Sequence, residues 1–145
     1  MGALFIALAA FGMQVDVPRA ELCMAAHRVV LAEATSQEVL WSPGPEGGLE
    51  TRTWFTTKRD IRAPGPDHIE LVMPGGQKDG FEHWVEHSPT FVEGQQYLLF
   101  LAPHPERGLE VLGGEQGAIA IRQTPGGPGE TLSSALRSLG GCYAP

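Results

Sequence analysis

The most suggestive chemical cluster in the chain is the segment 83–87, His-Trp-Val-Glu-His. On a β-strand, alternate residues share one face, and ~3.3 Å per residue separates the two imidazoles by about 13 Å, too far to share one metal ion. On a helix, His83 and His87 would lie on one face and could bind zinc, although Glu86 is displaced from its place in the H-E-x-x-H signature. We favour a solvated edge strand, with Zn²⁺ or Cu²⁺ binding by the two histidines as the alternative.

Other residue types that support catalysis lack the settings they require. Ser88, Ser133 and Ser134 have no G-x-S-x-G context, so a serine nucleophile would need partners from unrelated loops. The glycine pairs 75–76 and 126–127 match neither the G-x-x-x-x-G-K-[ST] nor the G-x-G-x-x-G pattern, and they indicate turns. Because no catalytic motif is complete, we predict that the protein is not an enzyme and needs no cofactor.

Large aromatic side chains suit contact surfaces instead of catalysis. Tryptophan combines a wide contact area with a polar N–H group. We predict a binding surface around Trp54, Phe81 and Trp84, to which Trp41 could contribute. The alternative is that these side chains cap a small core.

The chain has two cysteines, Cys23 and Cys142, near the two ends of the expected domain. A disulfide between them would fit an oxidising compartment. In the chain-entropy description, closing so long a loop stabilises a fold by about 4–5 kcal/mol. Two unrelated buried thiols are the alternative, and no C-x-x-C spacing indicates a redox or zinc site.

Glycine and proline clusters divide the chain into short apolar runs. The 19 glycines and 12 prolines fall between these runs, which favours many short strands over long helices. We predict a mainly β fold with a short N-terminal helix within residues 18–27 and a C-terminal helix at 131–139. The expected strands are residues 29–35 with a bent continuation to 41, 51–61, 68–73, 81–87, 97–101, 109–112 and 118–121, with 97–101 central in the core.

A length of 145 residues suits one domain with its own core.

The charge of the chain argues against nucleic acid as a partner. Ten Lys and Arg residues against 17 Asp and Glu residues give a formal net charge of -7. This charge opposes the phosphate neutralisation on which sequence-independent nucleic-acid binding depends, so we expect no nucleic acid to bind.

The first residues of the chain predict export. Residues 1–13 hold an unbroken apolar run that is too short to span a bilayer but suits the core of a signal peptide. Small residues at Ala10 and Gly12 fit cleavage before Met13, although basic residues before the run are missing. We predict a signal peptide at 1–12 and one β-rich domain at 13–145, exported to the periplasm, envelope or extracellular space without a membrane span. The alternative is a buried first strand or helix of a cytosolic protein.

The chain resembles two known groups of proteins. Over roughly residues 20–121 it resembles a pattern in uncharacterised exported bacterial proteins, in the segments 22–35, 51–57, 74–76, 89–101 and 113–121. Residues 89–101 read Pro-Thr-Phe-Val-Glu-Gly-Gln-Gln-Tyr-Leu-Leu-Phe-Leu, and residues 114–117 read Gly-Glu-Gln-Gly. Residues 23–32, together with the run that begins at Tyr97, are similar to netrin-type modules and tissue inhibitors of metalloproteinases. That similarity implies a small OB-like barrel, here of five to seven short strands. Inhibition in that group depends on a cysteine at the mature N-terminus, so Cys23 would need cleavage immediately before it.

These observations predict an exported, non-enzymatic binding or interaction domain whose partner is a protein or another extracellular ligand. Two alternatives remain open. The first is a metal-binding protein that uses His83 and His87, with His68 or His104 brought close by strand pairing. The second is an inhibitor of secreted proteases, which the netrin-type resemblance implies.

Overall fold

The fold of the chain is mainly β, as predicted, with short helices near both ends of the described part. The computed structural model describes residues 15–45 and 47–143, so the predicted signal peptide at 1–12 lies outside the described residues. The elements are α2 (Arg19–Ala25), β1 (Arg28–Trp41), β2 (Leu49–Arg62), β3 (His68–Pro74), β4 (Gly76–Lys78), β5 (Phe81–His83), β6 (Gln96–His104), β7 (Gly108–Val111), η2 (Gly114–Gly117), β8 (Ala118–Ile121), α3 (Leu132–Arg137) and η3 (Gly140–Cys142). No described helix is both long and apolar enough to cross a membrane.

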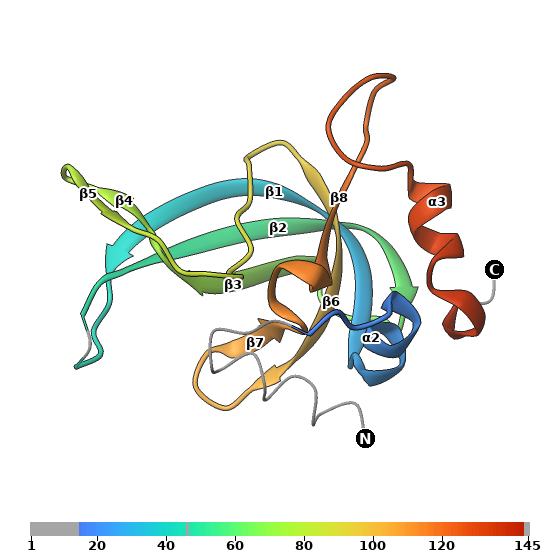
Figure 1. The fold of residues 1–145 in the computed structure, drawn as a ribbon, viewed down its shortest axis with the longest axis horizontal. Helices are drawn as coiled ribbons and strands as arrows, with labels where there is room; N and C mark the ends of the chain where they lie inside the picture. Colours follow the sequence, from blue (N-terminus) through green and yellow to red (C-terminus); the bar gives the residue numbers. More distant parts are fainter. Residues whose placement is uncertain (1–14, 46, 144–145) are drawn as a thin grey trace.

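A long, curved hairpin of β1 and β2 organises the main sheet. The sheet has the order β3-β2-β1-β6-β7, all pairs antiparallel, and β8 also pairs with β6. β1 pairs with β2 out to Trp41, but with β6 only from Arg28 to Glu33. Register shifts within β1 indicate bulges, which bend a strand and increase its twist. The outer half of this hairpin therefore extends beyond β6, as Figure 1 shows.

The described strands do not form a closed barrel. β3 and β7 are the two ends of the sheet order, and they lie against each other without a hydrogen-bonded ladder. The sheet is therefore open between them, and the OB-like barrel predicted from the netrin-type resemblance is not confirmed. The strands are also less uniformly short than predicted, since β1 and β2 have 14 residues each.

Two apolar layers pack on opposite sides of β6. Leu98 and Phe100 belong to the layer that α2 and α3 cover, whereas Leu99 and Leu101 belong to the layer beside β2 and β3. All four side chains are fully buried. Alternate residues of a strand point to opposite faces, so a strand buried on both sides has an unbroken apolar sequence. The predicted central position of residues 97–101 is confirmed.

One predicted strand is wrong over most of its length. The edge strand expected at 81–87 ends at His83, and β5 pairs only with the three-residue strand β4. Beyond it, the Ser88 N–H donates to the Val85 carbonyl in a turn, and His87 has a φ of +62°, which an L-residue does not adopt in a strand. The alternation in the sequence was imperfect, and the local turn geometry ends the strand.

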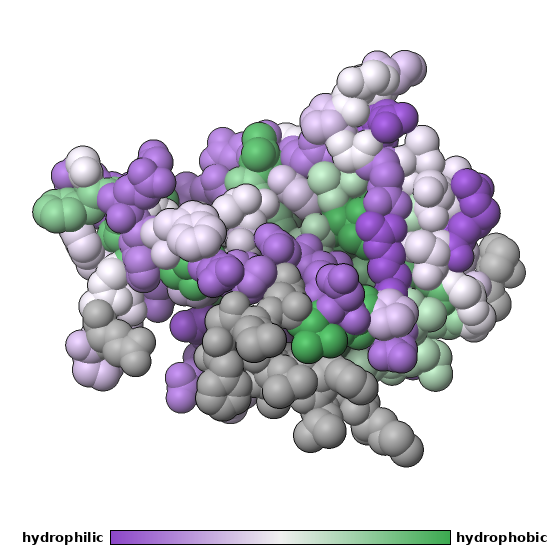
Figure 2. All heavy atoms as spheres, viewed as in Figure 1, coloured by the Kyte–Doolittle hydropathy of each residue, from purple (hydrophilic) through white to green (hydrophobic). Residues whose placement is uncertain are grey.

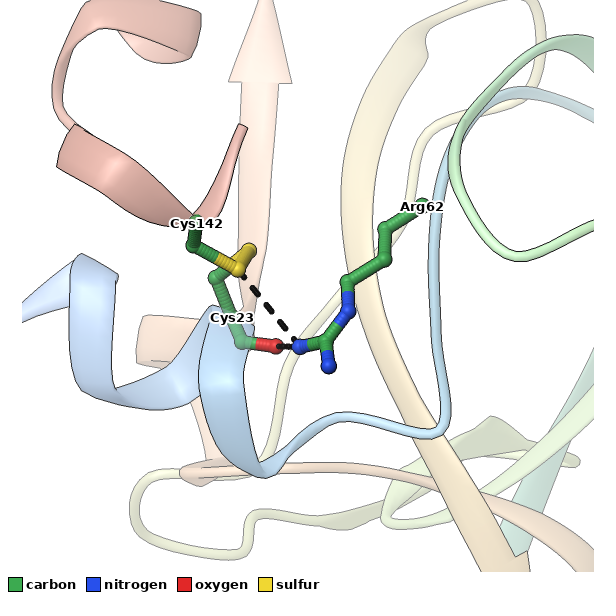
Figure 3. The surroundings of a disulfide bond; sticks show 3 residues. All are labelled: Cys23, Arg62 and Cys142. Atoms are coloured by element: carbon green, nitrogen blue, oxygen red, sulfur yellow. Dashed lines mark hydrogen bonds between the residues drawn. A yellow bond between two sulfur atoms is a disulfide. The ribbon is translucent and has the colours of Figure 1, made fainter. Parts of the chain in front are cut away.

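The predicted disulfide between Cys23 and Cys142 is present. It joins α2 to η3, and the guanidinium of Arg62, at the end of β2, lies beside it (Figure 3). Arg62 Nη1 donates to the Cys23 carbonyl and lies 3.5 Å from the Cys142 sulfur. The two helices and this disulfide lie at one end of the molecule, and the β4–β5 hairpin lies at the other (Figure 1).

An ion pair near the disulfide end makes stability depend on pH. Both carboxylate oxygens of Glu130 accept hydrogen bonds from Arg19, at 2.7 and 2.9 Å. The Arg19 guanidinium lowers the pKa of Glu130 below its ordinary value of 4.5, an effect that exceeds the opposing effect of burial. A lowered folded-state pKa stabilises the fold above the unfolded value, and this contribution is lost as pH falls through the folded-state pKa.

Replacing Glu130 with glutamine is therefore expected to lower the free energy of unfolding at pH 7 by roughly 0.5–1 kcal/mol, the range of half-exposed ion pairs. Urea denaturation of both proteins at pH 7 and pH 3 measures the effect. The difference between them should shrink at pH 3, because the approach to the folded-state pKa of Glu130 begins to remove the charge that Arg19 binds. An equal difference at both pH values would show that the ion pair is not its cause.

Candidate functional site

A cavity of about 300 Å³ lies between the outer half of the β1–β2 hairpin and the segment that follows β3. We call this cavity the hairpin cleft. It is lined by residues 73–77, 83–85 and 88–91 and by Gln37, Val39, Thr51 and Thr53. Strands β1 and β2 thus form its floor, and the β4–β5 hairpin with the loop after it forms its roof.

The floor of the cleft consists of cross-strand pairs on one face of the hairpin. Gln37 of β1 faces Thr53 of β2, and Val39 faces Thr51. The Gln37 side-chain amide donates to Thr53 Oγ1 at 3.1 Å and to the Phe91 carbonyl at 2.8 Å. Gln37 therefore joins the floor to the loop above it.

The roof lies close to the floor because Gly76 has no side chain. Its φ is +146°, and an added Cβ would come within 2.7 Å of Thr51 Oγ1 and 3.0 Å of Val39 Cγ1. Thr51 Oγ1 donates to the Gly75 carbonyl at 2.8 Å, and the Gly75 N–H donates to the Leu49 carbonyl at 2.7 Å. Glycine at position 76 permits both the backbone conformation and this close approach.

His83 fastens the roof to the beginning of β2. Its Nδ1 accepts a hydrogen bond from the Leu49 N–H at 3.0 Å. The ring also packs tightly on Gly48, where an added Cβ would come within 2.6 Å of the imidazole. The hydrogen bond and the close packing give His83 a structural role at the margin of the cleft.

Three aromatic rings anchor the loop over the inner end of the cleft. The Phe91 ring centroid lies 4.9 Å from that of Phe55 and 4.9 Å from that of Tyr97. Both pairs have the edge-to-face geometry that aromatic rings prefer. Tyr97 Oη accepts the Val92 N–H at 2.8 Å. Burial raises the pKa of Tyr97 above its ordinary value of 10.0, and the bond from Val92 opposes this by a smaller amount. The hydroxyl therefore stays neutral at physiological pH.

The outer rim of the cleft exposes aromatic surface. Trp84 lines the cleft and is 75% exposed, and Phe81, in β5, is 62% exposed. Trp41, at the end of β1, is 50% exposed and contacts Phe81 edge-to-face at 5.5 Å between ring centroids. Figure 2 shows hydrophobic side chains at this end of the molecule, over the tip of the β4–β5 hairpin. Such a group of exposed aromatic rings marks an interaction site more often than a solvated surface.

The lining and the rim of the cleft differ in charge. The lining contains no Asp, Glu, Lys or Arg residue. Three exposed glutamates surround the roof of the cleft along the chain: Glu82 and Glu86 stand next to lining residues, and Glu93 lies two residues after Phe91. Lys78 and Asp79, at the hairpin turn, offset each other. The cleft therefore offers an uncharged interior within an acidic rim.

Two surface depressions are larger than the cleft but lie over ion pairs. One, of about 600 Å³, is lined in part by Arg19 and Glu130, and the other, of about 630 Å³, by Arg52 and Glu70. The two side chains in each depression form an ion pair, with N–O distances of 2.7 Å in the first and 2.9 Å in the second. The smaller hairpin cleft is the better candidate because its lining is uncharged and its aromatic rim is exposed.

The two histidines of the predicted metal pair have different surroundings. His83 accepts the Leu49 N–H through Nδ1, as described above. His87 lies in the loop, with its Nε2 3.3 Å from Glu86 and its Nδ1 3.3 Å from Glu115. The expected sharing of one strand face is wrong because β5 ends at His83.

Of the other predicted histidines, His104 lines a depression of about 240 Å³ that His87 also lines, and His68 lines neither this depression nor the hairpin cleft. His68 begins β3 on the exposed surface, and His104 Nδ1 accepts the N–H groups of Glu106 and Arg107, both at 3.1 Å. In the part of the chain that the structure describes, no group of three or more His, Cys, Asp or Glu side chains is placed to hold a metal ion. Zinc or copper binding remains a prediction for metal titration.

The predicted aromatic surface is divided between two faces. Phe81 and Trp84 lie at the cleft rim, whereas Trp54 alternates with the buried Thr53 and Phe55 and so lies on the opposite face of β2. Its ring is half-buried and contacts the Arg52 guanidinium at 5.9 Å. Trp41, which sequence suggested only as a contributor, meets Phe81 at the rim.

Cys23 is placed unlike the metal-chelating cysteine that the netrin-type resemblance implies. It lies within α2, fully buried and bonded to Cys142. For Cys23 to become the N-terminal residue that chelates a protease metal, the chain would have to be cut within α2. Protease inhibition therefore remains a prediction without a specific structural observation in its favour.

Several residues of the cleft were not expected from sequence. Gln37, Thr51 and Phe91 come from separate segments and meet only through strand pairing. One local signal was present: Gly75 and Gly76 follow a proline directly, and the turn they form sets the roof on the floor.

Comparison of the chain with protein-family profiles, characterised proteins and solved structures finds no significant match.

Proposed function

We propose that this chain is an exported, non-enzymatic binding domain and that the hairpin cleft is its binding site. The observation that carries the proposal is an uncharged cavity, held open by its own hydrogen bonds, with exposed aromatic rings at its entrance. Binding sites in proteins are typically preformed cavities of this kind, with a few placed polar groups. The Cys23–Cys142 disulfide supports export, because such bonds persist in oxidising compartments.

The chemistry of the lining indicates the class of ligand. Met73, Val85 and Phe91 provide apolar contact, while Gln77 and Thr90 provide an amide and a hydroxyl group at exposed positions. A charged group entering the cavity would lose water without gaining an opposite charge, which is costly. The ligand group that enters is therefore neutral and largely apolar. The lining holds neither a pair of carboxylates nor a cysteine beside a base. Such a lining fits binding better than acid–base or nucleophilic catalysis.

An OB-like architecture is part of this proposal. The strongly bent β1, the order β3-β2-β1-β6-β7 and the approach of β3 to β7 support a partly open barrel. In such folds, ligands bind on the sheet face and the loops beside it, and the hairpin cleft has a comparable position.

Replacing Trp84 with alanine is expected to weaken binding of a neutral apolar fluorophore, Nile red, about tenfold or more, since exposed aromatic rings dominate such sites. Trp84 is 75% exposed, so the free energy of unfolding should change by no more than about 0.5 kcal/mol. Fluorescence titration of the disulfide-bonded protein measures the affinity, and urea denaturation measures the stability.

Met24→Ala is the matched control for Trp84→Ala. Met24 is 64% exposed on α2, at the end of the molecule away from the cleft, and its replacement should leave the affinity unchanged. Nile red that fails to bind the wild-type protein, or that binds both variants equally, would contradict the cleft as the binding site.

A further inference from the structure

The outer half of β1 has a free edge beside the hairpin cleft. β2 pairs with β1 as far as Trp41, but on the other side β6 stops at Glu33. The main chain of Ala34 still bonds to the loop, through Gln95 and Gly94. Beyond this point, no strand among the described residues pairs with that side of β1.

The alternation of the ladder shows which groups point to the free edge. The Ser42 N–H donates to the Gly48 carbonyl across the hairpin. In this half of β1, the backbone N–H and C=O groups of the even-numbered residues therefore point toward β2. The N–H and C=O groups of Val39, and the N–H of Trp41, therefore point away from β2. In the described part of the chain, no hydrogen bond to these groups is found.

At Gln37 a side chain takes the place of a neighbouring strand. The Gln37 N–H points to the same edge and donates to the Glu93 carboxylate at 2.9 Å. Proteins commonly protect strand edges with charged side chains in this way. This protection ends at Gln37. The edge at Val39 and Trp41 is left open, next to the part of the cleft that Val39 lines.

An open strand edge next to a pocket is the arrangement that binds extended peptides. The ligand backbone adds a strand, and alternate side chains enter the neighbouring pocket. A cavity of about 300 Å³ is at the lower limit for small-molecule sites, and it suits one large apolar side chain better than a larger ligand. The aromatic rings of Trp41 and Trp84 would cover the next side chains along the peptide.

The charges around the edge determine the flanks of such a peptide. Glu82 and Glu86 flank Trp84 in sequence, and the Glu93 carboxylate accepts the Gln37 N–H at the edge. The whole chain carries a formal charge of -7. Electrostatic complementarity then favours basic residues on either side of an apolar centre.

We propose that the hairpin cleft binds a short, extended peptide segment of a partner protein, whose backbone pairs with β1 at Val39 and Trp41. One apolar side chain of the peptide enters the cleft, and its flanking residues are basic. This inference rests on the proposed function and specifies its ligand.

The test uses a blocked heptapeptide with a central phenylalanine, alternating valine and threonine around it, and a lysine at each end. Isothermal titration with the disulfide-bonded protein should give a dissociation constant in the micromolar range. Methylation of the central backbone nitrogens removes N–H donors without removing side chains, and it should weaken binding tenfold or more. Glutamate in place of the lysines should also weaken binding, as should added salt.

On the protein, Val39→Pro removes the edge N–H that the peptide would use, while Val39→Ala keeps it. Proline is tolerated at an edge whose N–H faces solvent, because the ladder to β2 does not use that group. Val39→Pro should bind the peptide at least tenfold more weakly than Val39→Ala. Hydrogen exchange in the wild-type protein gives a readout that needs no variant: the Val39 and Trp41 amides should be protected when peptide is bound.

Each contrary outcome has a distinct meaning. Equal binding of the methylated peptide, or unchanged exchange at Val39 and Trp41, would overturn the strand-addition proposal. A wild-type dimer that Val39→Pro converts to a monomer would show that a second copy of the chain occupies the edge, and it would overturn the proposal as well. Nile red binding without peptide binding would leave the cleft as a binding site and remove only the peptide. Failure of both ligands would remove the proposed function.

Discussion

The variant Cys142→Ser is expected to lower the free energy of unfolding by about 4–5 kcal/mol, the largest effect of any single substitution considered. The disulfide joins residues 119 positions apart, so its loss restores to the unfolded chain the entropy of a very long loop. In the folded state, Cys142 is also the link that holds η3 against the buried Cys23 of α2. Urea denaturation of the wild type and the variant at pH 7 measures the difference.

The wild-type protein under a dithiol reductant is the natural control for this variant. It should unfold at the same urea concentration as Cys142→Ser, because both lack only the covalent link. Cys142→Ser should leave the Nile red affinity of its folded fraction unchanged, since the disulfide and the cleft lie at opposite ends of the molecule. A loss of less than about 1 kcal/mol would contradict the loop-entropy account of what the bond contributes to stability.

Phe91→Ala is expected to lower the free energy of unfolding by about 3–5 kcal/mol and to abolish the cleft. Phe91 is 7% exposed, and its ring fills the space between Phe55 and Tyr97. Removing a buried phenyl ring loses its transfer free energy and leaves a void that the neighbours fill only in part. The backbone of the same residue accepts the Gln37 amide, so loss of the anchor also frees the loop from the floor.

Two further variants separate packing from other effects of this substitution. Phe91→Leu keeps most of the buried apolar volume and should lose much less stability than Phe91→Ala. Val92→Ala changes a neighbouring side chain that is 66% exposed and should have almost no effect. Urea denaturation and Nile red titration of all three give both readouts. If Phe91→Ala lost stability but bound Nile red normally, the loop would not depend on this ring for its position.

The parts of the fold that follow from local patterns were predictable from the sequence. The unbroken apolar run at 97–101 indicates a strand buried on both faces, and it is the central strand β6. The helical spacing of Leu132, Ala135 and Leu136 predicted α3, which is capped by Thr131 Oγ1 accepting the Ser134 N–H. Each of these signals is complete within ten residues, so no knowledge of the rest of the chain was needed.

The parts that depend on pairing between distant segments were not predictable. The open edge between β3 and β7 is decided by how far the sheet curves, which the alternation of single strands does not encode. The strand predicted at 81–87 failed for a related reason. Its residues alternate, but His83 bonds to Leu49 from another hairpin and the following residues turn away.

The residues of the candidate site likewise divide into those that the sequence could predict and those that it could not. Exposed aromatic residues near position 83 were expected, and two of them, Phe81 and Trp84, lie at the rim of the cleft. The floor residues Gln37 and Thr51 carry no signal of their own, because an amide and a hydroxyl group in a strand are ordinary surface residues. Their role follows only from the approach of Gly76, which brings a separate hairpin onto them.

The position of the disulfide has a mechanical consequence. Tension applied to the chain outside residues 23 and 142 would pass from one cysteine to the other through the sulfur–sulfur bond. The sheet and the cleft between them would bear none of it. The segment between the two cysteines, which would span on the order of 400 Å if fully extended, would stay folded under tension until a reductant opened the bond. A domain tethered at both ends in an oxidising environment could thus keep its cleft intact under forces that pull ordinary sheets apart.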